Sequence, residues 1–479
     1  MKKFLVVLMG LLFTTGAFAQ DAGSGVQFDY NLYGLAFGTI GSYGSDEKWD
    51  YQHIRLRPMF TAGNENIKGV VRLQIDQKYG SLTEPSVNLN YNGSSSPYDA
   101  YWGTQADPAG AGPSARNRAV KIYVAYLELS NLFVNGLSLT TGIKDYFYPI
   151  ITDTELALTA ATYDFGMGSV SLYYFKLDEN SLYSRHWNVD DPNAPYWDPA
   201  KNQDAQAYGI DATIKAGLVD IRPAFFFVNT GKGWGPKDYV YDYSIASPYK
   251  TNEITTTDLK VYIGAINASG DMGIFNFDAT VAYLKAKSKW VNEEIPPSTN
   301  VTSGKYNQSA YAVDLNANVK PDKNIVAGVF GTYASGTKDG KENKKLPFSA
   351  TVHSLFGYAP AGKLFFLQSG GSHALGGLEP ENLGIDYDRL YKYGNMTFGL
   401  NAQYTIQKFT IMAQYGYMMA ANKNKQGDKN IGSEIDGKIS FEAAPKTDLF
   451  LEYAYVIKGD DTLLKKNIQQ ILWGLSTSI

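Results

Sequence analysis

Apolar and polar side chains alternate along the C-terminal stretch of the chain, from residue 430 to 479. Over 433–442 one face carries Ser433, Ile435, Gly437, Ile439 and Phe441, and the other carries Glu434, Asp436, Lys438, Ser440 and Glu442. The alternation returns at 449–458 and 471–479. A period of two residues predicts β-strands, because successive side chains of a strand point to opposite faces. Strands of about ten residues with one apolar, aromatic-rich face and one charged face are typical of outer-membrane β-barrels.

The same pattern predicts hairpins over the rest of the chain, for example 51–62 with 68–78. Some segments are harder to assign: the two faces of 26–37 are poorly separated, and Lys121 and Glu128 require opposite faces of 120–129. In 258–268 the pattern places Lys260 on the inward face. Short and long connections alternate strictly, which predicts short periplasmic turns, long extracellular loops and both chain ends in the periplasm. The predicted fold is all-β, a transmembrane antiparallel up-and-down β-barrel of about 18 strands, within a range of roughly 16–20.

Composition fits this architecture. The chain has 36 Tyr, 24 Phe, 7 Trp and 47 Gly, with a mean hydropathy of −0.26. In a barrel only alternate residues face lipid, and Tyr and Trp gather at the two interfaces. The absence of Cys excludes disulfides and covalent haem attachment through Cys-x-x-Cys-His. The net charge of −4 argues against a nucleic-acid partner.

The first residues read as a secretory signal peptide. Lys2 and Lys3 precede an apolar run at 4–13, and Ala17-Phe18-Ala19 provides an A-x-A cleavage site. Cleavage near Ala19 is expected to leave 20–479 as a single outer-membrane β-barrel domain, located in the cell outer membrane of a Gram-negative type of cell. No plug of roughly 100 residues precedes the first predicted strand, which argues against a TonB-dependent transporter.

Charged residues on the predicted inward faces are candidate pore-lining residues that set selectivity. The basic candidates are Arg55, Arg57, Arg72, Lys144 and Arg222, and the acidic candidates are Asp278, Asp314, Glu434, Asp436 and Glu452. Closure of the barrel brings the last strands beside the first ones. A basic wall next to an acidic wall would then orient polar solutes across the lumen. Alternatively, these charges pair as hydrated salt bridges and only keep the wall wet.

The longest predicted loop, 336–394, contains an apolar segment at 362–367 that is poorly suited to free exposure in water. We expect this segment to fold into the barrel mouth or to pack on a neighbouring loop. A small extracellular hairpin is the alternative.

Candidate chemistry is sparse. Ser372 and His373 are adjacent in a Gly-rich loop, which does not make a catalytic triad. Asp190, Asp191, Asp198 and Asp204 carry oxygen ligands that suit Ca²⁺, but they lack the spacing of an EF-hand calcium loop. We therefore predict no catalytic residues, no metal site and no cofactors, and a protein that is not an enzyme.

The segment 430–460 resembles the closing strands of the alginate-export-like outer-membrane channels. The matching residues are Ile431-Gly432-Ser433-Glu434-Ile435-Asp436 and Gly459-Asp460. Segments 53–60, 69–76, 125–129 and 137–145 resemble the same group. The resemblance implies a large monomeric, porin-like barrel that acts as a passive channel.

These observations favour an outer-membrane porin for passive diffusion of hydrophilic solutes or ions. One alternative is a substrate-selective channel for anionic saccharides. Others are a barrel sheath around a separately encoded electron-transfer partner, and a barrel enzyme such as a lipase. The expected partners are outer-membrane lipid and lipopolysaccharide, the barrel-assembly machinery and small hydrophilic solutes. No nucleic acid is expected, and the protein is expected to be a monomer or trimer.

Overall fold

Eighteen β-strands make up nearly all of the described structure. The computed structural model describes residues 26–44, 47–82, 118–178, 205–229, 253–293, 302–337, 393–423, 429–460 and 466–478, with the single residues 348, 352, 364, 365, 367 and 464. The strands are β1 Gln27–Tyr43, β2 Glu47–Gly63, β3 Ile67–Leu82, β4 Arg118–Leu129, β5 Leu137–Tyr148, β6 Thr152–Asp164, β7 Gly168–Asp178, β8 Ala205–Ala216, β9 Val219–Asn229, β10 Glu253–Asp271, β11 Phe275–Glu293, β12 Thr302–Asp322, β13 Ile325–Ser335, β14 Gly394–Ile406, β15 Phe409–Ala420, β16 Asn430–Ala444, β17 Thr447–Lys458 and β18 Ile468–Ser478. Among the described residues, no helix has the length and apolar character needed to cross a bilayer.

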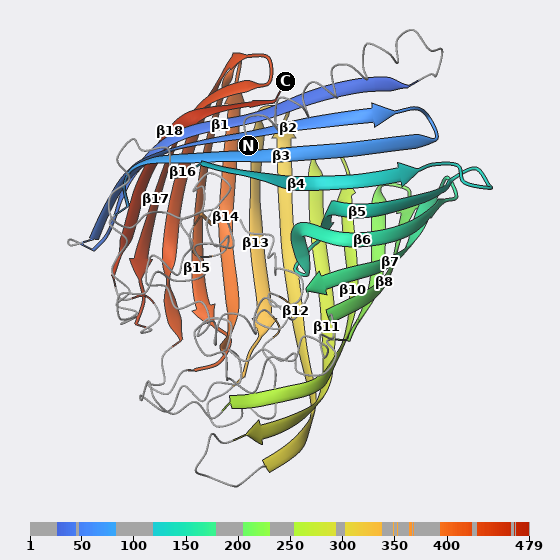
Figure 1. Ribbon diagram of the computed structural model, residues 1–479. Helices are drawn as coiled ribbons and strands as arrows, with labels where there is room; N and C mark the ends of the chain where they lie inside the picture. Colours follow the sequence, from blue (N-terminus) through green and yellow to red (C-terminus); the bar gives the residue numbers. More distant parts are fainter. Residues whose placement is uncertain are drawn as a thin grey trace.

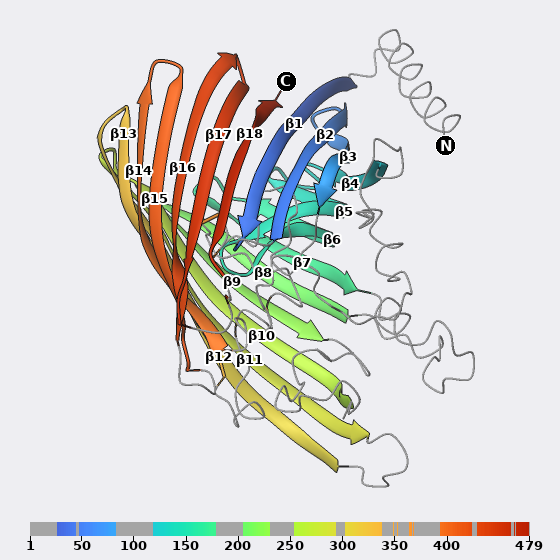
Figure 2. The same ribbon diagram turned by 90° about the vertical axis from the view of Figure 1, so that its left-hand side faces the viewer.

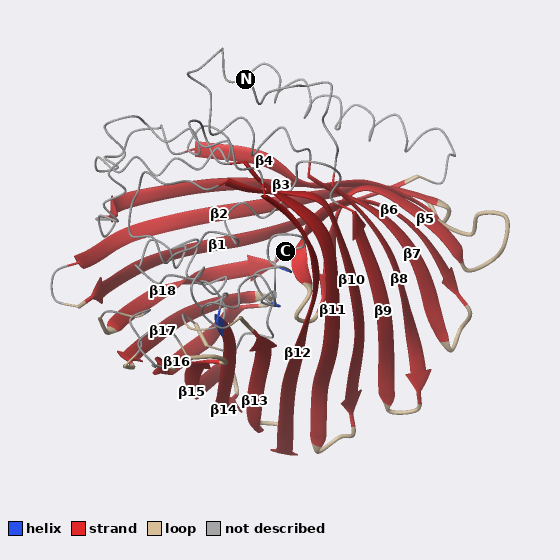
Figure 3. Ribbon diagram, turned by 90° about the horizontal axis from the view of Figure 1, so that it is seen from below, coloured by secondary structure: helices blue, strands red, loops and turns tan. Residues whose placement is uncertain are grey.

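The sheet is closed. Every strand pairs antiparallel with the next strand in the chain, and β1 pairs with β18 from Tyr33↔Ser478 to Tyr43↔Ile468. Figures 1 and 2 show β18 lying beside β1, and Figure 3 shows the strands encircling the interior. The predicted antiparallel barrel and its strand number are therefore confirmed.

Alternating side chains give the wall two different faces. On β16, Ile435 and Ile439 are 45% and 47% exposed on the outside, whereas Glu434 and Asp436, on either side of Ile435, are 0% and 1% exposed. On β2, Ile54 and Leu56 are exposed and His53 is buried. The outer face is the apolar band that a bilayer requires, and the faces predicted for the C-terminal strands are confirmed.

Connection length alternates less strictly than the sequence pattern suggests. The longest connections, such as 83–117 and 336–393, all lie at one end of the barrel, but 44–46 and 149–151 at that end are short. The Gly-rich stretch before 44 resembles a loop, yet it continues β1. Gly38 is needed there because an added Cβ would lie 2.6 Å from Cζ2 of Trp473 on β18.

A β-bulge at Tyr123 explains why β4 resists assignment to one pair of faces. Leu73 pairs with Ile122 and Arg72 pairs with Val124, so Tyr123 is the extra residue. Ile122 is 61% exposed and Val124 is 3% exposed, although both have even numbers. The bulge inverts the alternation, so positions of opposite parity on its two sides share a face.

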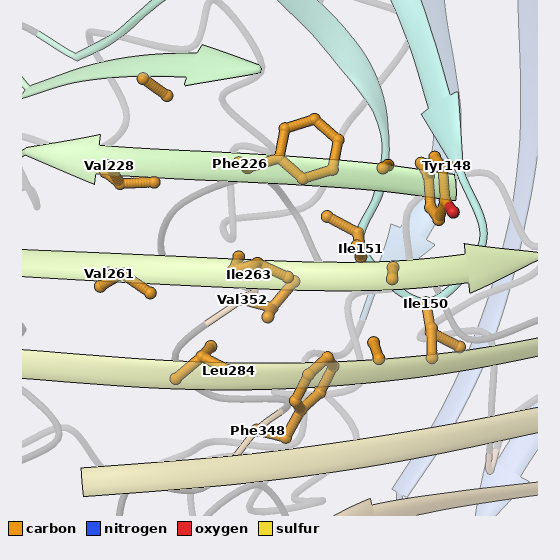
Figure 4. Packing of buried hydrophobic residues seen from close by; sticks show 14 of the residues in the cluster. Tyr148, Ile150, Ile151, Phe226, Val228, Val261, Ile263, Leu284, Phe348 and Val352 are labelled. Carbon is orange, nitrogen blue, oxygen red and sulfur yellow. The ribbon is translucent and has the colours of Figure 1, made fainter. Parts of the chain in front are cut away.

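The inner face carries two apolar patches that the sequence pattern does not reveal. One lies over β6–β12 and includes Phe226, Ile263 and Leu284, all fully buried. The other extends over β13–β18 and β1. Because Val261 and Ile263 face inward, the prediction for Lys260 is wrong: its position belongs to the outward face with Ile266, which is 56% exposed. Inward apolar residues are stable here because segments from the loop end cover them (Figure 4).

Candidate functional site

The ten predicted pore-lining residues lie on the face opposite the exposed apolar band. The basic ones stand on β2, β3, β5 and β9, and the acidic ones stand on β11, β12, β16 and β17. Their surroundings differ from one group to the next, and these differences decide which charges a solute inside the barrel would meet.

The clearest basic site surrounds the ring of Tyr123. The guanidinium carbons of Arg57 and Arg72 lie 4.2 Å and 4.5 Å from the ring centroid, within the range of cation–π contacts. Arg57 Nε also donates a hydrogen bond of 2.8 Å to Gln74 Oε1. Arg55 precedes this site on the same face of β2 and is half-buried. Sequence reasoning missed Tyr123, because its place depends on the bulge.

Two ion pairs extend the basic site across the boundary between β4 and β5. Arg72 donates to both carboxylate oxygens of Asp145, at 2.7 Å and 2.8 Å. Lys144 Nζ lies 3.3 Å from Glu128 Oε2. The ladder between these strands runs only from Ala125↔Ile143 to Leu129↔Leu139. The pair of Lys144 with Glu128 joins β5 to β4, and the pair of Arg72 with Asp145 joins β3 to β5. The side chains of Arg72 and Lys144 stay 21% and 36% exposed.

Arg222 is engaged in an internal network. Its Nε donates to Asp211 Oδ2 at 3.1 Å, and the hydroxyls of Tyr146 and Tyr173 donate to the same carboxylate at 3.1 Å and 3.2 Å. Another guanidinium nitrogen donates to the Phe147 carbonyl oxygen at 2.9 Å. Arg222 therefore neutralises Asp211 and anchors the end of β5.

The connection between β5 and β6 is held against the inner wall by this network. The Tyr148 hydroxyl donates to the Arg222 carbonyl oxygen, and Ile150 and Ile151, which follow it, are fully buried. Figure 4 shows Ile151 between Phe226 of β9 and Ile263 of β10, with Ile150 farther to the right. The short connection is thus an inward-folded apolar tip.

The acidic residues of β16 bind a segment of the longest loop. Leu367 N donates to Glu434 Oε2 at 2.8 Å, and Phe365 N donates to Asp436 Oδ2 at 3.2 Å. Gln414 Nε2 donates to the same Asp436 oxygen at 2.7 Å. Both carboxylates are almost fully buried, at 0% and 1% exposure. They hold the loop by its backbone.

The other acidic candidates are also partnered. Glu452 lies 2.7 Å from Lys438 Nζ and is 3% exposed. Asp314 accepts a hydrogen bond from Thr332 and is 1% exposed. Asp278, on β11, is half-buried and accepts a hydrogen bond of 3.0 Å from Asn267 Nδ2.

The loop 336–393 is attached to the wall in two places. Phe348 and Val352 pack over β10 and β11 (Figure 4), and Leu364 and Leu367 pack in the second apolar patch. Leu364 fits against β15 because Gly416 has no side chain: an added Cβ would lie 2.5 Å from Leu364 Cδ1. The prediction that 362–367 folds into the barrel is confirmed for residues 364, 365 and 367.

The described residues contain no group of three or more His, Asp or Glu side chains placed to hold a metal ion. His53 packs edge-on against Phe37, with ring centroids 5.2 Å apart. Ser372 and His373, and Asp190, Asp191, Asp198 and Asp204, lie outside the described residues.

Comparison with known proteins gives a structural match only. No sequence family and no curated protein matches this chain. Among solved structures, OccAB4 of Acinetobacter baumannii superposes with a TM-score of 0.54 and 9% identity, covering 96% of this chain and 100% of that one. OccK9 (OpdG) of Pseudomonas aeruginosa superposes with a TM-score of 0.52 and 10% identity, covering 95% and 98%. At these identities the likeness establishes a shared porin-type barrel fold over nearly the whole chain.

Proposed function

We propose that this protein is an outer-membrane channel for the passive diffusion of hydrophilic solutes, with a preference for anions. An 18-stranded barrel is too wide for wall side chains to fill, so it encloses an aqueous path wherever loops leave room. The observation that supports the anion preference is a difference in solvent exposure between the basic and the acidic side chains of the lumen. Arg72 and Lys144 remain partly exposed beside their carboxylate partners Asp145 and Glu128, whereas four of the five predicted acidic residues, Asp314, Glu434, Asp436 and Glu452, are at most 3% exposed.

The loop attachments define where a solute would pass. Residues 348 and 352 occupy the wall over β10 and β11, and residues 364–367 occupy the wall over β15 and β16. A solute that passes along the wall of β2–β4 would meet Arg55, Arg57 and Arg72, where positive charge raises the local concentration of anions.

Anionic saccharides are a second candidate class. The Arg57 and Arg72 guanidinium groups lie over the same ring, and guanidinium groups bind carboxylates in a bidentate way. OccK2 (OpdF) of Pseudomonas aeruginosa, with a similar fold at a TM-score of 0.50 and 8% identity, was solved in complex with glucuronate.

Liposome swelling with the mature protein tests this proposal. Glucose and glucuronate differ mainly by one carboxylate, so their swelling rates report size exclusion and charge preference separately. We expect both to enter, glucuronate faster, with a smaller difference at 1 M salt because charges are then screened within about 3 Å. Equal rates would remove the anion preference, and no swelling above that of protein-free liposomes would contradict the channel itself.

A further inference from the structure

Four neighbouring turns at the short-turn end of the barrel expose large apolar side chains. They are the turns between β4 and β5, β6 and β7, β8 and β9, and β10 and β11. Their most exposed apolar residues are Phe133 at 95%, Met167 at 73%, Leu218 at 68% and Ile274 at 72%. Because the strands follow one another around the barrel, these turns form one continuous arc, the apolar rim.

The other four turns at the same end are polar. Their residues include Asn64 and Glu65 after β2, Lys323 after β12, Lys408 after β14 and Lys446 after β16, all exposed. These turns are also neighbours around the barrel, so one side of this end is apolar and the other is polar. A contiguous apolar surface of this kind marks a contact with lipid or with another protein.

The apolar rim continues the lipid-facing band below it. Tyr163 near the end of β6 and Phe165 in the turn that follows are 43% and 45% exposed, and Ile214 near the end of β8 is 43% exposed. On β11, Phe275 stacks on Phe277 with ring centroids 6.0 Å apart, next to Ile274. The apolar surface thus extends from strand to turn on this side.

Charged residues near the rim lie on the luminal face. Lys215 and Asp220 are register partners and share the inward face with Asp211 and Arg222. Asp271 pairs with Lys320 Nζ at 2.8 Å on the inward face of β10 and β12. The rim is therefore amphipathic, with charge toward the lumen and apolar side chains on the outside and at the tips.

Strand length agrees with a contact between rim and lipid. β7 and β9 have 11 residues each, close to the number that a transmembrane strand needs. The turns next to these two strands therefore lie near the hydrocarbon boundary, whereas β10 and β11, which flank Ile274, have 19 residues each.

We propose that the apolar rim is immersed in the leaflet at the short-turn end and that the barrel is tilted, with the side from β4 to β11 deeper in this leaflet than the side from β12 to β3. The occupant of the rim is bilayer lipid, because the rim is continuous with the surface that the fold already assigns to lipid.

Site-directed spin labelling of the reconstituted protein tests the proposal directly, since the chain has no Cys of its own. The rim variants are Met167→Cys, Leu218→Cys and Ile274→Cys, and the matched variants on the polar side are Lys323→Cys, Lys408→Cys and Lys446→Cys. Each variant is first checked for a folded barrel by its heat-modifiable migration. Accessibility to oxygen, which concentrates in lipid, and to a neutral nickel chelate, which stays in water, is then measured in liposomes.

We expect the rim labels to be accessible to oxygen and shielded from nickel, and the polar-side labels to show the reverse. Rim labels as accessible to the nickel chelate as the labels at 323, 408 and 446 would overturn the proposal. That result would instead indicate a docking surface for a periplasmic protein. Six labels buried equally in lipid would overturn the tilt.

Discussion

At the scale of single residues, the two arginines over Tyr123 are the part of the lumen best suited to select ions. Their positions are fixed by the ring, by Gln74 and by Asp145, so little side-chain freedom remains to be lost when an anion arrives. A guanidinium group about 5 Å from a permeating ion contributes about 0.8 kcal/mol even at the dielectric constant of water.

Replacing both charges with neutral side chains should weaken the anion preference. We expect Arg57→Gln combined with Arg72→Gln to lower the anion-to-cation permeability ratio several-fold, measured as the reversal potential under a salt gradient. Lys287→Gln removes a positive charge from the outward face of β11 and should leave the ratio unchanged. An unaltered ratio in the double variant would show that these arginines do not act on permeating ions.

The ion pair formed by Asp211 and Arg222 stabilises the folded barrel. The Asp211 side chain is 5% exposed, and removing one partner of such a pair leaves an uncompensated charge. Asp211→Ala should lower the free energy of unfolding by about 3–5 kcal/mol, measured by urea unfolding in lipid vesicles. Asp220→Ala, at an exposed position of the same hairpin, should cost much less. Equal losses in both variants would contradict the structural role of the pair.

The inward direction of Arg55, Arg57, Glu434 and Asp436 could be predicted from sequence because a strand alternates strictly. Their surroundings could not. The hydrogen-bond donors to Glu434 and Asp436 stand 67 and 71 residues away in the chain, in a loop whose path no local pattern specifies. The inward position of Tyr123 could not be predicted for a different reason: one extra residue in β4 inverts the alternation of the strand at this point.

At the scale of elements, the inward-folded loop segment is the main obstacle inside the barrel. Its backbone is held by two buried carboxylates of β16. Glu434→Ala combined with Asp436→Ala should release the segment and raise the single-channel conductance, with added current noise from its motion. Glu442→Ala, on the exposed end of the same strand, provides the matched control. Conductance equal to that of the unmodified protein would mean that residues 364–367 do not narrow the path.

The same segment can be displaced without changing a charge. Gly416→Val puts a branched side chain where Leu364 now lies, because even one Cβ would approach Leu364 Cδ1 to 2.5 Å. We expect a rise in conductance with the anion preference retained. Gly264→Ala, where an added Cβ meets nothing within 4 Å, should change neither property. A Gly416→Val channel with unchanged conductance would show that the loop adapts in place.

The hairpins of the barrel were predictable because their outer faces must be apolar, and the period of two is preserved wherever lipid lies outside. Two connections between strands could not be predicted in this way. The end of β1 is rich in Gly, which suggests a loop, and the tip at Ile150 and Ile151 is apolar because it packs against the inner wall. In both places tertiary packing determines the local sequence, and the packing partner is remote in the chain.

At the scale of the whole molecule, the pairing of β1 with β18 closes the barrel. Loop residues occupy the walls over β10–β11 and β15–β16, and Arg72, which is partly exposed and paired with Asp145, lies on the wall of β2–β4. These two features together support the proposal that the barrel is an open passive channel that prefers anions.

Single-channel recording of the purified mature protein in planar bilayers, with the reversal potential measured under a potassium chloride gradient, tests that claim most directly. The account predicts stable openings and a reversal potential displaced toward the chloride equilibrium potential. A folded, heat-modifiable barrel with no conductance above the bare bilayer would contradict an open channel, and a displacement toward the potassium equilibrium potential would contradict the role assigned to the basic wall.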